Sequence, residues 1–295
     1  MSENTLKQYD SSLKKWWKFC TEKKQDFFTI TINNLLEFLT TLYKEGASYG
    51  SLNTHRSAIS LISLNKIGED PIISRFLKGI ANLRPINTRY AATWDTNIVL
   101  DKVKTWFPLS NLNLKELTDK TVILLALGTA SRAQTLAAIE IDNIKETKES
   151  LEIRIIERTK TDKPGKAKPL LCLPFFKEKP ELCIANTVIQ YIKVTAKLRK
   201  DTKHLFISLN KPHKKVTTQT ISRWIKKVLE KCGIDISIFS SHSTRHASSS
   251  TAFINGLDLE AIRKAAGWSE GSTVFAKFYN RPISKNFSFA RAVVK

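Results

Sequence analysis

The residues that could do chemistry lie in a short stretch near the end of the 295-residue chain. His242 and Arg245 stand three positions apart, so a helix would place both side chains on one face. Trp268 follows 23 residues after Arg245, and Tyr279 follows 11 residues after Trp268. Imidazole, guanidinium, indole N–H and phenol groups can together hold a phosphate and attack it. The stretch therefore predicts half of a phosphoryl-transfer site with a tyrosine nucleophile.

The other half must hold the charge of the phosphate and protonate the leaving oxygen. Arg132 follows a Gly-Thr-Ala-Ser turn at a predicted helix start, where main-chain N–H groups also attract anions. The planar guanidinium group of Arg132 or Arg245 suits phosphate better than a lysine ammonium does. The sequence has no acidic cluster with metal-ligand spacing, which disfavours a two-metal nuclease.

The charge balance indicates the kind of partner. The chain has 48 Lys and Arg residues against 27 Asp and Glu residues, a formal net charge of +21. Self-repulsion on this scale costs stability, and a polyanion is its commonest counterpart, so nucleic acid is the expected partner. A ribosome-like or chaperone-like basic protein is the alternative. A membrane-surface protein is disfavoured, because no long helix combines a basic face with a strongly apolar one.

Length and composition are those of a globular protein of about two domains. The sequence contains neither an apolar run of about 20 residues nor the hydrophobic core of a signal peptide, so we expect no membrane span and no secretion. Four cysteines are scattered without CxxC spacing, which indicates thiols in a reducing compartment rather than disulfides or a zinc site. They are Cys20, Cys172, Cys183 and Cys232.

Apolar residues at three-to-four spacing predict an all-helical N-terminal part. Its helices are expected over 5–20, over 31–45 with Thr31 as the cap, from Ser51 onward, and over 71–80. The first helix should bury a stripe made of Leu6, Tyr9, Leu13, Trp16, Trp17 and Cys20. Residues 81–94 break the periodicity and contain Pro85, which predicts a linker.

The rest of the chain is predicted to be mostly helical with one small hairpin. Alternating residues predict strands over 151–157 and 169–173, joined by a lysine-rich loop over 159–167. Helices are expected from Asp95, over 117–127, over 131–139 after a turn at Gly128 and Thr129, over 184–199 and over 217–232. Three short helices should follow, capped by Ser240 or Ser241, by Asp258, and by Ser272 or Thr273.

The order Arg132, Lys160, His242, Arg245, Trp268 and Tyr279 resembles the tyrosine recombinase (phage integrase) family. Residues 1–88, with Thr-His-Arg-Ser-Ala-Ile at 54–59, are similar to its helical, SAM-like core-binding domain, and residues 89–295 to its catalytic domain. The resemblance implies a mainly α fold with a small antiparallel β-sheet. The 241–254 helix, Trp268 and the Phe-Tyr-Asn-Arg-Pro element at 278–282 resemble recombinases of eukaryotic mobile elements of the DIRS and Crypton kinds.

The resemblance also implies a role for each residue. Tyr279 would attack the scissile phosphate and form a 3′-phosphotyrosyl link that frees a 5′-hydroxyl. Arg132 and Arg245 would clamp the non-bridging oxygens. Lys160 would protonate the leaving oxygen, and His242 would be an acid–base partner.

The family pattern is loosest at Trp268 and in the spacer that follows it, and the sequence also differs from the pattern at Thr135. Trp268 stands where most members carry a second histidine, and its indole N–H can donate to a phosphate oxygen but cannot shuttle a proton. Thr135 occupies a position that is often acidic in the family. The gap between Trp268 and Tyr279 is about two residues longer than the commonest spacing.

Lys163 or Lys166, in the same loop as Lys160, could also be the proton donor.

DNA contact is expected from basic residues on both domains, although such residues are often a solvated face. The candidates are Lys14, Lys15, Lys18, Arg56, Lys163 and Lys166. The resemblance implies duplex DNA as the partner, four protomers on two sites, a monomer or dimer off DNA, and neither a metal nor a nucleotide cofactor. We expect a nuclear protein for a eukaryotic mobile element, and a cytoplasmic or nucleoid one for a bacterium or phage.

The sequence has two alternative interpretations. A type IB topoisomerase-like enzyme shares the tyrosine chemistry, but the helical N-terminal part and the His-x-x-Arg motif argue against it. A domesticated DNA-binding or virion-structural protein would have lost catalysis, and the complete set of site residues argues against that.

Overall fold

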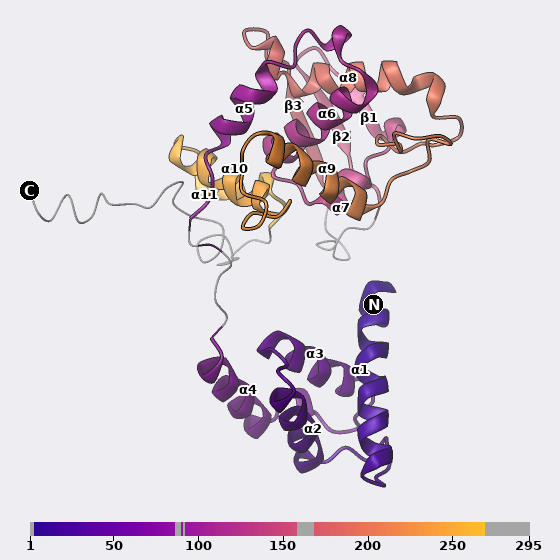
Figure 1. Ribbon diagram of the computed structural model, residues 1–295, viewed down its shortest axis with the longest axis vertical. Helices are drawn as coiled ribbons and strands as arrows, with labels where there is room; N and C mark the ends of the chain where they lie inside the picture. Colours follow the sequence, from indigo (N-terminus) through magenta and orange to yellow (C-terminus); the bar gives the residue numbers. More distant parts are fainter. Residues whose placement is uncertain (1–2, 86–89, 91, 158–167, 269–295) are drawn as a thin grey trace, which may run out of the picture. The chain divides into compact units, whose positions relative to one another are not determined.

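The computed structural model describes residues 3–85, 90, 92–157 and 168–268 (Figure 1). The chain divides into two compact units, Met1–Thr88 and Arg89–Lys295. Each unit has its own hydrophobic core of buried side chains.

The N-terminal unit is helical throughout its regular elements. They are α1 (Glu3–Glu22), α2 (Ile32–Lys44), α3 (Tyr49–Ile59), the short 3-10 helix η1 (Ile67–Glu69) and α4 (Pro71–Leu83). Thr31, Ser48 and Asp70 cap α2, α3 and α4, each accepting a hydrogen bond from a first-turn amide. The four predicted helices are therefore confirmed, with α3 beginning two residues before Ser51.

Helix α1 buries a different stripe from the one predicted. Trp16 and Cys20 are buried as expected, but Trp17 is 59% exposed and Leu6 is 51% exposed. The helix packs against α3, and successive residues of a helix point about 100° apart, so Trp16 and Trp17 cannot both face α3. The Trp17 ring lies instead 5.3 Å from the ring of Phe27, in the connection to α2.

The segment between the two units is shorter at both ends than the linker predicted over 81–94. Helix α4 continues to Leu83, three residues beyond its predicted end. Thr93 and Trp94 are buried in the C-terminal unit, and the Trp94 indole Nε1 donates to the Ser243 hydroxyl at 2.9 Å. Trp94 and Ser243 are 149 residues apart in the sequence, so local periodicity could not predict this contact.

The C-terminal unit surrounds α6 with other helices. Its α-helices are α5 (Thr96–Lys104), α6 (Leu114–Thr129), α7 (Ala133–Ala137), α8 (Ile184–Thr195), α9 (Thr218–Lys231), α10 (Ser243–Ile254) and α11 (Leu259–Ala265). Its 3-10 helices are Leu109–Asn111, Ile141–Asn143, Pro180–Leu182 and Ala196–Leu198. Helix α6 is buried along most of its length and contacts α7, α8, α9 and α10. Figure 1 shows it in the interior of the unit, labelled between α5, α8 and α9.

The predicted turn at Gly128 is wrong, because α6 continues to Thr129 and the chain turns at Ala130 with φ 47°. Gly128 has a packing role instead. A Cβ atom added there would lie 2.1 Å from the Cδ1 atom of Ile184, so glycine allows α6 to approach α8 closely.

The sheet has the antiparallel order β1-β2-β3 in the described residues. Its strands are β1 (Ile144–Glu146), β2 (Ser150–Arg154) and β3 (Leu170–Pro174). Leu151 pairs with Leu173 and Ile153 with Leu171, and all four side chains are buried on one face. The predicted hairpin and the mainly α fold with a small antiparallel sheet are confirmed. Strand β1 was missed because three residues show too little alternation to predict a strand.

Candidate functional site

Arg245 joins three segments that are distant in the sequence. It lies in the first turn of α10 and is 1% exposed. Its Nη1 atom donates to the Ala130 carbonyl, 115 residues away, and its Nη2 atom donates to the Ala266 carbonyl at 3.0 Å. The guanidinium group therefore ties the α6–α7 turn and the end of α11 to α10.

Trp268 packs its ring against the same guanidinium group. The Arg245 Cζ atom lies 5.1 Å from the Trp268 ring centroid, within the range of a cation–π contact. Gly267, at φ 66°, turns the chain after α11, and the Trp268 amide donates to the Arg263 carbonyl at 2.9 Å. Trp268 is 7% exposed and forms a small apolar cluster with Ala130, Ile262 and Ala266. In this structure the indole ring supports Arg245.

Arg132 lies two residues after the carbonyl that Arg245 binds. It occupies the N-cap position of α7 with extended backbone (φ −74°, ψ 150°) and is half-buried. Helix α7 ends at Ala137, before the predicted Ile139, because the following residues pair with the 203–205 segment. The Leu205 amide donates to the Ile139 carbonyl, and the Ile141 amide donates to the Lys203 carbonyl, both at 2.8 Å.

His242 is exposed, unlike Arg245. It occupies the N-cap position of α10 itself, so the predicted caps Ser240 and Ser241 are wrong. These two serines contribute main-chain carbonyls rather than side chains. The Ser240 carbonyl accepts from the Ser243 amide at 2.9 Å, and the Ser241 carbonyl accepts from the Thr244 hydroxyl at 2.8 Å. The first turn of α10 therefore carries one surface imidazole and one internal guanidinium group.

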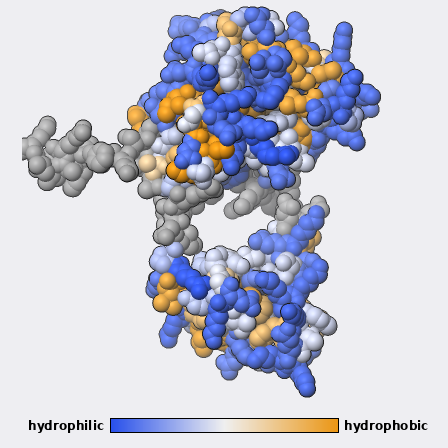
Figure 2. All heavy atoms as spheres, in the orientation of Figure 1, coloured by the Kyte–Doolittle hydropathy of each residue, from blue (hydrophilic) through white to orange (hydrophobic). Residues whose placement is uncertain are grey.

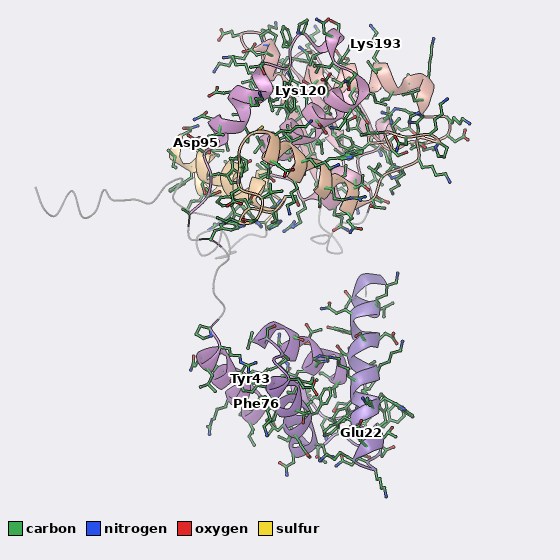
Figure 3. The ribbon with its side chains drawn as sticks, in the orientation of Figure 1. Glu22, Tyr43, Phe76, Asp95, Lys120 and Lys193 are labelled. Carbon is green, nitrogen blue, oxygen red and sulfur yellow. The ribbon has the colours of Figure 1, made fainter. Side chains whose placement is uncertain are left out.

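Helix α10 is fixed to the N-terminal end of α5. The Trp94 indole donates to Ser243, and the hydroxyl groups of Thr96 and Thr251 lie 3.1 Å apart. Asp95 caps α5 through the Asn97 amide and marks the start of this helix in Figure 3. These contacts hold the backbone of His242 and Arg245 in place.

The remaining predicted residues of the reaction lie outside the described residues. They are Lys160, Lys163, Lys166 and Tyr279. Near the predicted lysine loop, the Ile155 amide donates to the Pro169 carbonyl at 3.0 Å, which extends the pairing of β2 and β3.

A charged cluster at this end of the sheet was not predicted. The Glu157 carboxylate lies 2.8 Å from the Lys215 ammonium and 3.9 Å from the His204 Nε2 atom. His204 also lies 3.7 Å from Glu140, with which it forms an isolated β-bridge. Burial, followed by the Lys215 charge, lowers the pKa of His204 despite the two carboxylates. No local motif marks these residues, because they meet only through the fold.

The predicted DNA-binding residues of the N-terminal unit differ in their surroundings. Lys14, Lys15 and Lys18 are exposed on α1, where Lys14 pairs with Asp10 at 2.7 Å and Lys18 lies 3.7 Å from Glu22. Arg56 is half-buried and donates to the Gly68 carbonyl at 2.8 Å, which ties α3 to η1. Figure 2 shows hydrophilic residues over much of the visible surface of this unit.

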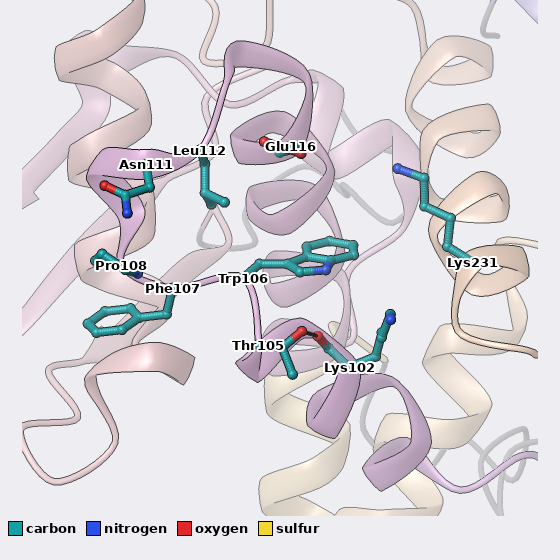
Figure 4. Close-up of a pocket in the computed structure, with 9 residues that line it drawn as sticks. All are labelled: Lys102, Thr105, Trp106, Phe107, Pro108, Asn111, Leu112, Glu116 and Lys231. Carbon is teal, nitrogen blue, oxygen red and sulfur yellow. Dashed lines mark hydrogen bonds between the residues drawn. The ribbon is translucent and has the colours of Figure 1, made fainter.

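A cavity of about 510 Å³ lies elsewhere in the C-terminal unit (Figure 4). It is lined by Lys102, Thr105, Trp106, Phe107, Pro108, Asn111, Leu112, Glu116 and Lys231. None of these is a predicted reaction residue, so the cavity is separate from the site around Arg245. The close-up shows the Trp106 ring in the middle of the lining residues, with Lys231 approaching from α9.

A buried lysine supports a wall of this cavity. Lys120 is fully buried, and its ammonium donates to the carbonyls of Val103 at 3.2 Å and Trp106 at 2.5 Å (Figure 3). Burial lowers its pKa to about 8. The adjacent Asp119 is 1% exposed and accepts from Lys115 at 2.8 Å and Lys231 at 2.6 Å. These groups fasten α5 and α9 to α6.

Residues 3–85, 90, 92–157 and 168–268 contain no group of three His, Cys, Asp or Glu side chains that could hold a metal ion. Among the helices in those same ranges, none is both long and apolar enough to cross a membrane.

Residues 100–285 match the phage integrase family, and residues 1–61 match the N-terminal SAM-like domain of phage integrases. The chain is 23% identical to tyrosine recombinase XerA of Pyrococcus furiosus over 295 residues, covering 98% of this chain and 87% of that protein. It is 24% identical to tyrosine recombinase XerD of Staphylococcus haemolyticus over 286 residues, covering 92% and 86%. These relatives do not test the resemblance to DIRS and Crypton recombinases, which stays a prediction.

Solved recombinase structures share the fold. The XerH site-specific recombinase, bound to palindromic difH substrate in a post-cleavage complex, has a TM-score of 0.63 at 16% identity, with 92% of this chain and 76% of that chain covered. A lambda integrase dimer bound to a COC′ core site has a TM-score of 0.55 at 15% identity, covering 97% and 74%. The chain therefore belongs to the phage integrase family of tyrosine recombinases, enzymes that cut and rejoin DNA at specific sites.

Proposed function

We propose that Tyr279 is the nucleophile with which this recombinase cuts duplex DNA. Its phenol oxygen attacks the scissile phosphorus, a 3′-phosphotyrosyl bond forms, and the bond to the 5′-oxygen breaks. His242 accepts the phenol proton, and Lys160 gives a proton to the leaving 5′-oxygen. Rejoining is the reverse step with the 5′-hydroxyl of another strand, so the covalent link conserves the energy of the broken bond.

The observation that carries this proposal is the assembly around Arg245. Its guanidinium group is fixed by the Trp268 ring and by the carbonyls of Ala130 and Ala266. Ala130 lies two residues before the half-buried Arg132. Cationic groups that are held in place without substrate need no reorganisation when negative charge develops on a phosphate. Arg132 and Arg245 are therefore assigned to the non-bridging oxygens, with Trp268 supporting Arg245.

Duplex DNA is the proposed partner. The net charge of +21 favours a polyanion, and the exposed lysines of α1 suit phosphate contacts. The XerH and lambda integrase structures are of complexes with DNA, and the latter contains a dimer. We further propose four protomers on two sites during strand exchange. The nucleus is the proposed location for a eukaryotic mobile element, and the nucleoid for a bacterial or phage one.

The experiment that tests the nucleophile is covalent capture from a library of random duplexes, each with a nick that lets the cut strand end diffuse away. Protein–DNA adducts are recovered under denaturing conditions and sequenced. The wild-type chain should enrich a common site, and Tyr279→Phe should recover no adduct. Tyr49→Phe, a tyrosine change in the N-terminal unit, serves as the control and should enrich the same site. Adduct formation by Tyr279→Phe would refute the assignment.

A further inference from the structure

A chain of aromatic rings leads from the core of the C-terminal unit to His242. Phe239 packs against the main hydrophobic cluster, and its ring centroid lies 5.0 Å from that of Tyr90. The Tyr90 ring meets the His246 ring edge to face at 5.5 Å with an interplanar angle of 86°. The His246 ring meets the His242 ring in the same way at 5.6 Å and 79°.

The four rings differ in how deeply they are buried. His246 is 7% exposed, Tyr90 and Phe239 are half-buried, and His242 is exposed. An exposed side chain at a helix N-cap ordinarily samples several rotamers, and ordering it costs conformational entropy. His246 stands one helical turn after His242, so its ring can restrict the imidazole of His242 to one orientation. Tyr90, whose ring packs against Phe239, in turn holds His246 from a distant segment of the chain.

We infer that Tyr90 and His246 are positioning residues for His242 in strand cleavage. This inference rests on the proposed function, in which His242 accepts a proton from the nucleophile. The ring contacts keep the imidazole in one orientation before DNA binds, so that it need not be ordered during the reaction. Neither Tyr90 nor His246 touches the DNA in this role.

The ring of Tyr90 should matter more for cleavage than its hydroxyl group. Edge-to-face pairs depend on the ring quadrupole, which phenylalanine retains and leucine lacks. Tyr90→Phe should therefore cleave within about twofold of the wild-type rate. Tyr90→Leu should be slower by about two- to tenfold, the size expected for one aromatic contact. His246→Leu should be slowed to a similar extent.

The assay is single-turnover cleavage of the duplex enriched by the wild-type chain, carrying a bridging phosphorothiolate at the scissile position. The thiolate that leaves needs no proton, so slow variants still give measurable adducts. DNA affinity is measured separately by fluorescence anisotropy, and the melting temperature checks the fold. Tyr90→Leu should change the cleavage rate while leaving the DNA affinity and the melting temperature nearly unchanged.

A double-mutant cycle separates positioning from general packing. In a His242→Gln background, Tyr90→Leu should cause no further loss of rate, because the residue that it positions is gone. A further loss of the same size, or equal effects of Tyr90→Phe and Tyr90→Leu, would overturn the inference. If the wild-type chain itself formed no adduct, the proposed function would be refuted, and this inference would be refuted with it.

Discussion

Replacing Arg245 with lysine should destabilise the C-terminal unit although the charge is kept. The guanidinium group donates to the carbonyls of Ala130 and Ala266 with different nitrogen atoms, and it packs against the Trp268 ring. A lysine has one nitrogen atom on a flexible stem and cannot reproduce this fork. At 1% exposure, water cannot replace the lost partner of either carbonyl.

The size of the effect follows from these contacts. The lysine variant loses one charge-assisted hydrogen bond and leaves one buried carbonyl without a donor. Together these losses lower the free energy of unfolding by about 2–4 kcal/mol. For a unit of this size, each kcal/mol lowers the melting temperature by about 2–4 °C, so a fall of about 5–15 °C is expected. The assay is differential scanning calorimetry of the full chain, with the two units followed as separate transitions.

Arg223→Lys is the matched control for this prediction. Arg223 is exposed on α9, where its Nη2 atom donates to the neighbouring Thr220 hydroxyl at 3.2 Å. Its replacement should change stability by less than about 0.5 kcal/mol. If Arg245→Lys melted like Arg223→Lys, the view that Arg245 fastens three segments together would be refuted.

Three further predictions concern packing, pH and catalysis. Gly128→Ala should cost about 1–3 kcal/mol in urea unfolding because its Cβ atom meets Ile184, whereas Gly79→Ala in α4, with nothing within 4 Å, should be neutral or stabilising. Burial lowers the pKa of Lys120 from 10.5 to about 8, so between these pH values the unfolded chain holds one more proton there than the folded chain. The free energy of unfolding of the wild type relative to Lys120→Met should therefore rise by up to about 3 kcal/mol from pH 8 to 10.5, and a flat or falling difference would contradict this. Arg132→Ala should abolish cleavage in the adduct assay while DNA retention in a gel stays largely intact; equal loss of both would indicate a structural arginine.

Local patterns predicted most helices because their signals are local. Thr31 and Asp258 cap α2 and α11 as expected, since a cap and its amide partners lie within three residues. The apolar stripe of α9 was also predicted, and Ile221 and Val228 are fully buried. The set of site residues was recognised from their order in the sequence, which requires no knowledge of distances.

The environment of the site could not be predicted in this way. Arg245 sits in a polar run, Ser-Thr-Arg-His, that gives no sign of burial. Its partners Ala130 and Ala266 are bound through main-chain carbonyls, which every residue has, so no motif marks them. The contact between Tyr90 and His246 likewise joins segments more than 150 residues apart in the numbering. Such pairs become visible only once the chain is folded.

The most direct test of the central claim is mass spectrometry of the trapped protein–DNA adduct. The adduct is digested with nuclease and protease, and the modified peptide is sequenced. We predict a nucleotide joined through its 3′-phosphate to Tyr279, together with a free 5′-hydroxyl on the released strand. A nucleotide on another residue, or one joined through a 5′-phosphate, would contradict the proposed chemistry.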